Sequence, residues 1–246
     1  MIKKSTILLL ALTCSAVAIA KPSGNEWINY NQKYYKIPVS KNGIYRISQT
    51  VLNSAGIPIS SIDPRNLQLF CNGVEQKIYV EGEGDGSFDT NDFIEFYGEK
   101  NTGKYEFQMY SNASFHPDPY YSLINDTAMY FLTWNSSTSN ERMALETDNN
   151  FASYMPDSYF YQDKVLAFNS TYYAGETNSA GGSVAEYSPA EGYFDGVINL
   201  NQSKEKTVAT PYVFTSGPNA LIETVIVGAS LDRSKWGSPP DHHILF

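Results

Sequence analysis

The sequence predicts a mainly β protein, and three observations support this fold class. Aromatic residues make up 14% of the 246 residues, including 19 Tyr, whereas only 17% are charged. Short apolar runs, alternating or β-branched, recur between turns built from Gly, Asn and Pro. One short stretch alone has the pattern of a helix. We therefore expect an N-terminal β-rich domain with one short helix, followed by the start of a second, truncated β-sandwich.

Two hairpins are expected in the first half of the chain. Gly and Asn accept the backbone conformation that a tight hairpin turn requires. The turns are expected at Lys41-Asn42-Gly43 and at Asn72-Gly73. The strands that the pattern predicts here are residues 34–39, 44–47, 67–71, 74–80, 93–97 and 128–134, with one more over 142–145.

The single predicted helix follows the second of these strands. Ser48 is placed to cap a helix over residues 49–55, and Gly56 is placed to end it. Strand signals return near the C-terminus, at residues 207–214 and 220–227, and a further strand is expected to start at residues 243–246. A sandwich needs more strands than these to bury its faces, so we expect the chain to be the N-terminal part of a longer polypeptide.

These signals divide the chain into four predicted parts. A signal peptide is expected at residues 1–20, the β-rich domain at 21–146, an aromatic and Gly/Ser-rich connector at 147–200, and the incomplete β-sandwich at 201–246. The connector has no sustained period. We expect its aromatic side chains to pack on a sheet, and stacking on sugar rings is the alternative.

The N-terminus has the features of an export signal. Lys3 and Lys4 precede an apolar run, and Ala18-Ile19-Ala20 forms a small-x-small cleavage site. Lipid attachment at Cys14 is the weaker alternative, because the residues before it match a lipobox poorly. After cleavage only Cys71 remains, so no internal disulfide can form. The net charge of −9, with no basic patch, argues against nucleic acid as a partner.

An acidic, glycine-rich loop is the main candidate binding site. Counted from Glu81, its oxygen atoms have the spacing of an EF-hand-like calcium loop, and Gly86 holds the sixth, turning position. Phe88 is expected to anchor the loop in the core. The expected Ca²⁺ ligands are Glu81, Glu83, Asp85, Ser87 through its backbone carbonyl, Asp89 and Asp92.

The loop also departs from the EF-hand pattern. Glu81 replaces the usual Asp, Asp92 has a shorter arm than the usual Glu, and the flanks are predicted strands instead of helices. The simpler alternative is an acidic turn in which Gly84 and Gly86 supply positive φ angles. Five carboxylates repel one another, so either a bound metal or full solvation is expected.

No catalytic residue is predicted. Cys71 lies in an alternating strand, where a small buried thiol is the simple interpretation, and a nucleophile would need a lowered pKa and a nearby imidazole. His242 and His243 would point to opposite faces of a strand, so both cannot bind one zinc ion. His116 lies in a predicted loop and is expected to be solvated.

Several motifs occur in an order that resembles a known family. They are Gly43-Ile44-Tyr45-Arg46-Ile47, Ile62-Asp63-Pro64-Arg65-Asn66-Leu67, Gly82-Glu83-Gly84-Asp85-Gly86-Ser87-Phe88-Asp89, Asp92-Phe93-Ile94-Glu95-Phe96-Tyr97-Gly98, Tyr120-Tyr121-Ser122-Leu123-Ile124-Asn125-Asp126-Thr127 and Tyr130-Phe131-Leu132-Thr133. The series resembles the N-terminal region of gingipain-like cysteine peptidases, in particular PorU-type sortases of the type IX secretion system. Gly228-Ala229-Ser230 and Asp241-His242-His243 resemble the β-sandwich that precedes the catalytic domain in that family.

The resemblance implies an exported protein at the outer membrane, cell surface or periplasm of a Gram-negative bacterium. The family cleaves C-terminal sorting domains from cargo with a Cys–His pair on a caspase-like α/β domain, which this sequence lacks. The implied partners are that catalytic domain, secreted cargo and other outer-membrane components of the secretion system. The first hypothesis is thus a non-catalytic scaffold or docking region. A calcium-dependent surface binding or adhesion module is the second, and a stand-alone hydrolase ranks last.

Overall fold

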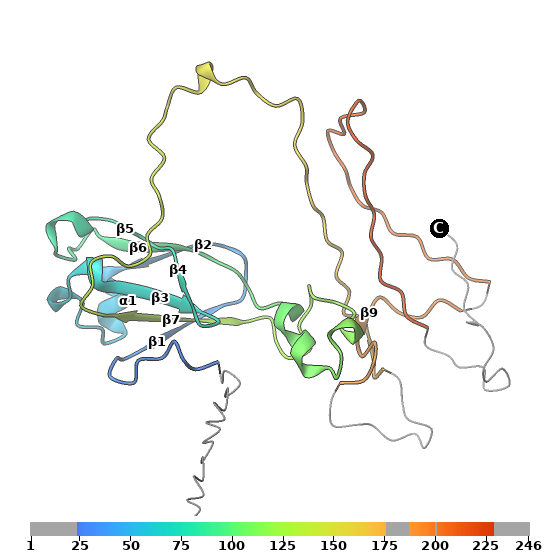
Figure 1. Cartoon of the computed structure of the whole chain (residues 1–246), viewed down its shortest axis with the longest axis horizontal. Coiled ribbons are helices and arrows are strands. Elements are labelled where there is room, and N and C mark those ends of the chain that lie inside the picture. The colour runs from blue at the N-terminus through green and yellow to red at the C-terminus, as the bar shows by residue number, and fades with distance from the viewer. Residues whose placement is uncertain (1–23, 176–186, 200, 229–246) are drawn as a thin grey trace, which may run out of the picture.

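The computed structural model describes residues 24–175, 187–199 and 201–228. The predicted signal peptide, Cys14, His242 and His243 lie outside the described residues, as does the end of the predicted sandwich. The described chain is mainly β, with several small sheets and a single α-helix (Figure 1). The predicted fold class is therefore confirmed.

Two antiparallel sheets form the main body of the protein. The first has the strand order β1-β7-β3-β4 and the second has the order β2-β6-β5 (Figure 1). The strands of the first sheet are β1 (Tyr35–Val39), β7 (Ala128–Trp134), β3 (Leu67–Cys71) and β4 (Val74–Gln76). Those of the second are β2 (Gly43–Ser48), β6 (Phe93–Gly98) and β5 (Tyr79–Val80).

One core lies between the two sheets. Apolar side chains at alternate positions of each strand point inward, so Leu67 and Leu69 of β3 meet Ile94 and Phe96 of β6 in the same cluster. The Phe96 ring lies 5.2 Å from the ring of Tyr130 on β7, measured between centroids. The alternation visible in the sequence thus fixes which face of each strand is buried.

Only one of the two predicted hairpins pairs its own strands. β3 and β4 pair across Asn72 and Gly73, whose φ angles are +50° and +79°, as a tight turn requires. β1 and β2 do not pair with each other. Instead β1 pairs with β7 and β2 pairs with β6, so the turn at residues 40–42 carries the chain from one sheet to the other.

The helix forms where the sequence predicts it. α1 (Gln49–Ser54) buries Leu52 in the core and ends before Gly56, which has a φ angle of +75°. The Ser48 side chain makes no capping hydrogen bond. The remaining helical elements are 3₁₀ turns: η1 (Ile59–Ser61), η2 (Pro64–Asn66), η3 (Glu83–Asp85), η4 (Gly103–Met109), η5 (Ala113–Phe115) and η6 (Phe151–Ser153).

A second, smaller unit joins segments far apart in sequence. The chain between β6 and β7 contacts β9 (Gly192–Phe194), where the rings of Tyr121 and Tyr193 lie 5.3 Å apart, and β9 pairs with β8 (Thr171–Tyr173). These two short strands were not predicted from the sequence. We call the contacts of this unit the clasp. Its hydrogen bonds run from the Tyr110 hydroxyl to the Glu191 carbonyl (2.6 Å), from Tyr187 N to the Met109 carbonyl and from Ala190 N to the Phe115 carbonyl.

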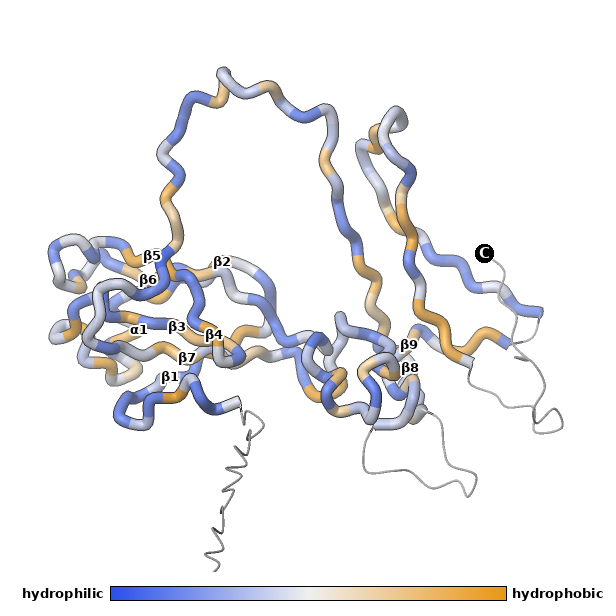
Figure 2. The backbone as a smooth tube through the Cα atoms, in the orientation of Figure 1, coloured by the Kyte–Doolittle hydropathy of each residue, from blue (hydrophilic) through white to orange (hydrophobic). Residues whose placement is uncertain are grey.

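The C-terminal strands expected at residues 207–214 and 220–227 do not form in the described residues. Residues 202–228 have no regular secondary structure, and apolar side chains such as Leu221 and Ile222 are exposed. Figure 2 shows these apolar stretches along an open course of the chain. A strand needs partners that satisfy its backbone groups, and none of the described strands pairs with this segment. Residues 142–145 likewise form only one bridge, between Ile78 and Arg142.

The clasp is predicted to loosen in acid because of His116. Burial lowers the pKa of His116, while the nearby Glu106 and Asp118 carboxylates oppose this shift, and its ring lies 5.2 Å from that of Tyr110. The folded clasp therefore favours the neutral imidazole. The contribution of neutral His116 to the stability of the clasp is fully present above the unfolded-state pKa of about 6.5 and declines as the pH falls below that value.

Thermal melting between pH 8 and pH 5 tests this prediction. His116→Gln is expected to reduce the loss of melting temperature on acidification, whatever its effect at pH 8. Carboxylates titrate in both proteins, so their effect on the melting temperature cancels when the two pH slopes are compared. An identical pH slope in the two proteins would contradict the assignment to His116.

Candidate functional site

The acidic loop joins β5 to β6 through the 3₁₀ turn η3. Gly82 and Gly86 flank this turn with φ angles of +79° and +80°. A Cβ atom on Gly82 would lie 2.3 Å from Asp92 Oδ1, so only glycine fits there. Phe88 is buried in the core, as predicted, and the Gln49 amide donates to its carbonyl at 2.7 Å.

The predicted calcium ligands make separate contacts within the chain. The hydroxyl of Tyr79 donates to Glu81, and the backbone N–H of Ser87 donates to Asp85 Oδ1 at 2.8 Å. The N–H of Asp89 donates to Asp92 Oδ2 at 2.6 Å. Each of these contacts satisfies one oxygen locally and does not bring the carboxylates to a common centre.

Glu83 pairs with Arg142, a residue that no sequence pattern connects with the acidic loop. Arg142 Nε lies 2.8 Å from Glu83 Oε2, and the two side chains are only 20% and 29% exposed. A guanidinium carries five N–H donors, and here every donor has an acceptor. The other acceptors are the backbone carbonyls of Leu67, Glu141, Pro64 and Arg65, at 3.0–3.1 Å. Arg142 therefore ties the acidic loop to η2, to β3 and to the chain leaving the domain.

A second guanidinium lies beside the same loop. Arg65 pairs with Asp63, with Nη2 2.5 Å from Oδ2, and its hydrogen bond is the main cause of the lowered pKa of Asp63. A Cβ atom on Gly86 would lie 3.1 Å from Arg65 Nη2. Glu83 and Asp85 also act electrostatically on Arg65 and raise its pKa. Two arginines thus supply positive charge beside the acidic loop.

The calcium site stays a prediction. Within the described parts of the chain, no three His, Cys, Asp or Glu side chains are grouped so that they could hold a metal ion. The donor oxygens have the right chemistry for Ca²⁺, but Glu83 would have to leave Arg142 and Glu81 would have to leave Tyr79. In this structure the residues form an acidic turn, in which Gly86 has the predicted positive φ angle and Gly84 does not, its place being taken by Gly82.

Cys71 is part of the core. Its side chain is 8% exposed at the end of β3, opposite Tyr130 of β7, and burial raises the pKa of the thiol. Burial also raises the pKa of Tyr130 to about 12. His116, the only histidine among the described residues, packs on Tyr110 in the clasp. No described imidazole can serve Cys71 as a base.

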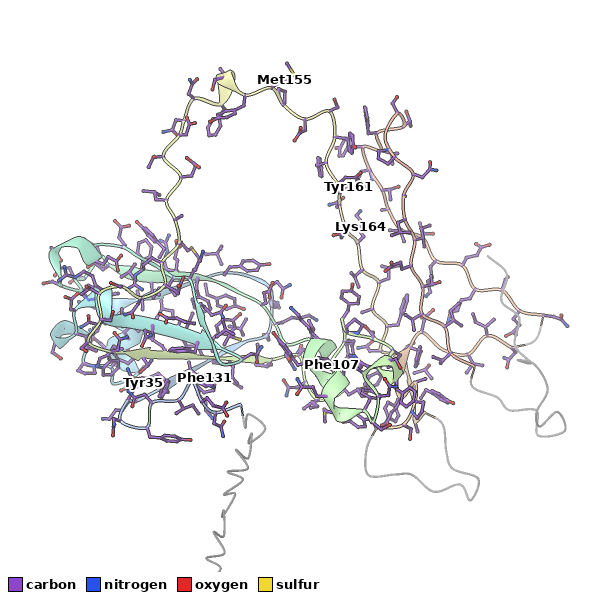
Figure 3. The ribbon with its side chains drawn as sticks, in the orientation of Figure 1. Tyr35, Phe107, Phe131, Met155, Tyr161 and Lys164 are labelled. Atoms are coloured by element: carbon purple, nitrogen blue, oxygen red, sulfur yellow. The ribbon has the colours of Figure 1, made fainter. Side chains whose placement is uncertain are left out.

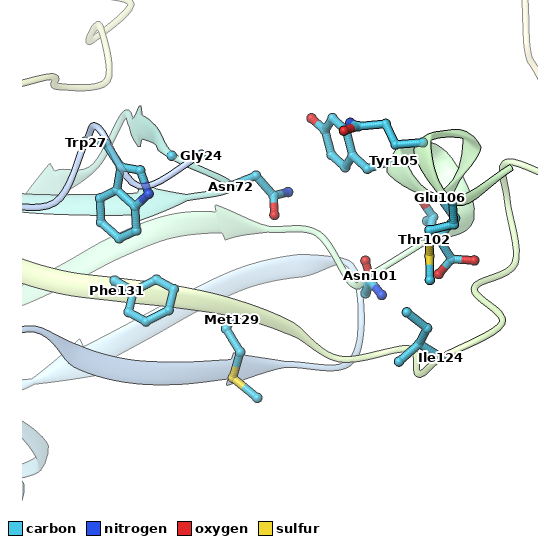
Figure 4. A pocket seen from close by; sticks show the side chains of 13 residues that line it. Gly24, Trp27, Asn72, Asn101, Thr102, Tyr105, Glu106, Ile124, Met129 and Phe131 are labelled. Carbon is cyan, nitrogen blue, oxygen red and sulfur yellow. The ribbon is translucent and has the colours of Figure 1, made fainter. Parts of the chain in front are cut away.

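A cleft of about 630 Å³ lies between the first sheet and η4 (Figure 4). Figure 4 shows Trp27, Phe131 and Met129 on the sheet side, with Tyr105 and Ile124 opposite them. Trp27 covers the outer face of the sheet and packs against Phe70 and Phe131, with ring centroids 5.1 and 5.5 Å away. The volume is typical of small-molecule pockets in proteins.

The walls of the cleft combine apolar and polar side chains, and the apolar ones are partly exposed. Met109, Met129, Tyr105 and Ile124 all keep at least two fifths of their surface open to solvent. Glu106 lies at the end of the cleft, where its carboxylate accepts hydrogen bonds from the Ser122 hydroxyl and the Leu123 N–H. The cleft is thus an open surface on which apolar side chains lie beside the polar side chains of Asn72, Asn101, Thr102 and Gln108.

Comparison of the chain with protein-family models, with curated proteins and with solved structures finds no match. Among the residues that the structure describes, no helix is long and apolar enough to cross a membrane.

The sequence pattern located the acidic loop correctly but did not reveal the arginine that pairs with it. Arg142 lies more than fifty residues after Glu83, and no local pattern connects the two. The cleft was missed for the same reason, because its walls come from the N-terminal segment, β7 and η4. Before β3 the contact is local: Asp63 accepts the N–H of Arg65 at 3.0 Å, as Asp commonly does in turns.

Replacement of Arg142 is predicted to destabilise the main body strongly. Arg142→Met leaves Glu83 without its cation and several carbonyls without donors, which costs about 3 kcal/mol of unfolding free energy. The unfolding free energy of Arg142→Lys is expected to lie between those of the wild type and Arg142→Met, because an ammonium keeps the charge but cannot reproduce the planar fork of a guanidinium. Urea unfolding followed by Trp fluorescence measures the change.

Arg46→Met is the matched control. Arg46 pairs with Glu95 at the same 2.8 Å separation, but its side chain is 59% exposed, and the guanidinium also lies 3.9 Å from the Phe93 ring centroid. Loss of so exposed a pair costs less than about 1 kcal/mol. Equal losses for Arg142→Met and Arg46→Met would contradict the anchoring role of Arg142.

Calcium binding has its own test. If the loop takes up Ca²⁺, adding the ion to chelator-treated protein will raise the melting temperature, because a ligand that binds only the folded state stabilises it. Asp85→Ala should abolish the increase. If Ca²⁺ does not change the melting temperature, the calcium prediction is wrong and the acidic turn is the interpretation that remains.

Proposed function

We propose that this chain is a non-catalytic scaffold or docking region of an exported gingipain-like cysteine endopeptidase, a sortase of type IX secretion. The resemblance of its ordered motifs suggested this role. The observation that carries the non-catalytic part is the environment of Cys71. The thiol is buried in the core, its pKa is raised, and no described imidazole lies beside it.

The chemistry of a cysteine peptidase explains why this environment matters. Its nucleophile is a thiolate, which needs a lowered pKa, a nearby base and access for the substrate. Cys71 has the opposite pKa shift and almost no exposed surface. Peptide cleavage by the complete polypeptide would therefore use residues outside those described here.

The family-like motifs have structural roles that support a scaffold. The Asp63-Pro64-Arg65 motif begins η2 and supplies carbonyls to Arg142. The motif at residues 82–89 forms the loop that pairs with the same arginine. These contacts stabilise one rigid body, on which secreted cargo and other outer-membrane components of the secretion system would dock.

The complete polypeptide in its producing cell tests the proposal. Cys71→Ser is predicted to leave cleavage of cargo sorting domains unchanged, within about twofold, because the thiol takes no part in the chemistry. Arg142→Met is predicted to reduce it through loss of the scaffold. The measurement is the ratio of cleaved to uncleaved cargo on immunoblots, at matched levels of the polypeptide.

Two results would contradict the proposal. If Cys71→Ser abolished cleavage while the protein still melted as wild type does, Cys71 would be a catalytic nucleophile. If the complete polypeptide cleaved no cargo in any form, the assignment to this family would fail.

A further inference from the structure

The segment of residues 144–167 between the two units, which we call the strap, is largely open to solvent. Its contacts with the C-terminal segment include the stacking of Tyr159 on Phe214, with ring centroids 5.3 Å apart, and a hydrogen bond from Lys164 Nζ to the Ala209 carbonyl. Every residue from 144 to 167 is exposed. Met155 and Phe160 are 94% and 84% exposed, and Figure 3 shows Met155 and Tyr161 projecting from the strap. Monomeric proteins rarely leave so many large apolar side chains uncovered, and such surfaces mark interaction sites.

The strap also has free backbone groups. After the 3₁₀ turn η6, whose last hydrogen bond is donated by Tyr154 N, no backbone–backbone hydrogen bond is made by the described residues until β8. Extended backbone of this kind can pair with amide groups of a partner. The strap therefore offers both apolar side chains and hydrogen-bonding groups.

Its own ends are fixed, which keeps the strap away from the main body of the same molecule. Arg142 and the bond from Met143 N to the Ile78 carbonyl (2.9 Å) hold the start. The Asn169 amide donates to the Tyr121 hydroxyl at 2.8 Å and holds the end. Between these anchors the strap arches away from both sheets (Figure 1).

The cleft beside η4 has the complementary surface. Met109, Met129 and Tyr105 present adaptable apolar walls to solvent. The side-chain amides of Asn72 and Gln108 line the cleft. Among the described residues, neither amide has a hydrogen-bond partner. They are therefore available to an extended backbone that enters the cleft.

The charges match at the rim of the cleft, whereas the Glu106 carboxylate at its end is already bonded to Ser122 and Leu123. The strap carries Glu146, Asp148, Asp157 and Asp163 against a single cation, Lys164. Lys100 and Lys104 flank the residues that line the cleft, and neither forms an ion pair with a described carboxylate. The Lys104 ammonium lies 5.7 Å from the ring centroid of Tyr105, a cleft residue. Opposite charges at the rim favour association and fix its direction.

We propose that the cleft binds the strap of a second copy of this chain, so that two copies exchange straps. Both surfaces are present on every copy, and reciprocal exchange is a closed two-fold arrangement. The aromatic and Met side chains of one strap enter the cleft of the other copy, and its carboxylates face Lys100 and Lys104. This inference is independent of the proposed secretion role.

Charge reversal tests the exchange. Sedimentation velocity of the wild-type chain should show dimers whose fraction increases with concentration and decreases with salt. The pair Asp157→Lys and Asp163→Lys should weaken dimerisation by about tenfold or more, as should the pair Lys100→Glu and Lys104→Glu. An equimolar mixture of the two charge-reversed variants should restore dimers, because each then offers one complementary cleft and strap.

Lys33→Glu with Lys77→Glu is the matched control. Both lysines are exposed, and neither lines the cleft nor is the cross-strand partner of a residue that lines it, so dimerisation should follow the wild type within about twofold. Far-ultraviolet circular dichroism and melting temperatures confirm that each variant is folded. The control separates a specific contact from a general effect of net charge.

A peptide in trans tests the cleft directly. A synthetic peptide of residues 146–164 is expected to change the fluorescence of Trp27, and the change should reach a plateau as the peptide concentration increases. Trp27→Phe should remove most of this change. A monomer at all concentrations, or a dimer that neither charge reversal weakens, would overturn the proposal. So would a peptide that leaves the fluorescence unchanged.

Discussion

The main body depends on one guanidinium that joins parts of the chain with no sequence proximity. Arg142 holds Glu83 of the acidic loop and the carbonyls of η2 and the start of β3 in a single fork. Without it, a carboxylate and several half-buried carbonyls would lack partners, and leaving such groups unsatisfied costs more than their pairing gains. The same residue fixes where the chain leaves the sheets, so it also fixes the start of the strap.

The acidic loop shows how a protein can satisfy a binding-site pattern internally. Its spacing matches that of a calcium loop, yet arginine side chains supply the nearby positive charge, and backbone N–H groups and a tyrosine hydroxyl take the oxygens. Carboxylates bound in this way support a rigid turn between β5 and β6. That turn and the thiol buried on β3, beside Tyr130 of β7, are both parts of the folded framework.

Interaction surfaces lie at the junction of the two units. The cleft uses side chains from the outer face of the first sheet and from η4, while the strap spans the gap between Arg142 and the clasp. Both expose apolar groups that the described chain does not cover. The paired sheets support both surfaces, because the start of the strap and the sheet side of the cleft belong to them.

The sequence by itself determined the mainly β class, the helix after β2, the hairpin at Asn72-Gly73 and the position of the acidic loop. Each of these depends on local periodicity or on turn residues, which neighbouring side chains encode. The separation of β1 from β2 into different sheets, the pairing of Glu83 with Arg142, and the clasp were decided by tertiary structure. These features join residues that are distant in sequence, and the strands near residues 207–227 failed to form for the same reason, because a strand is stable only with a partner.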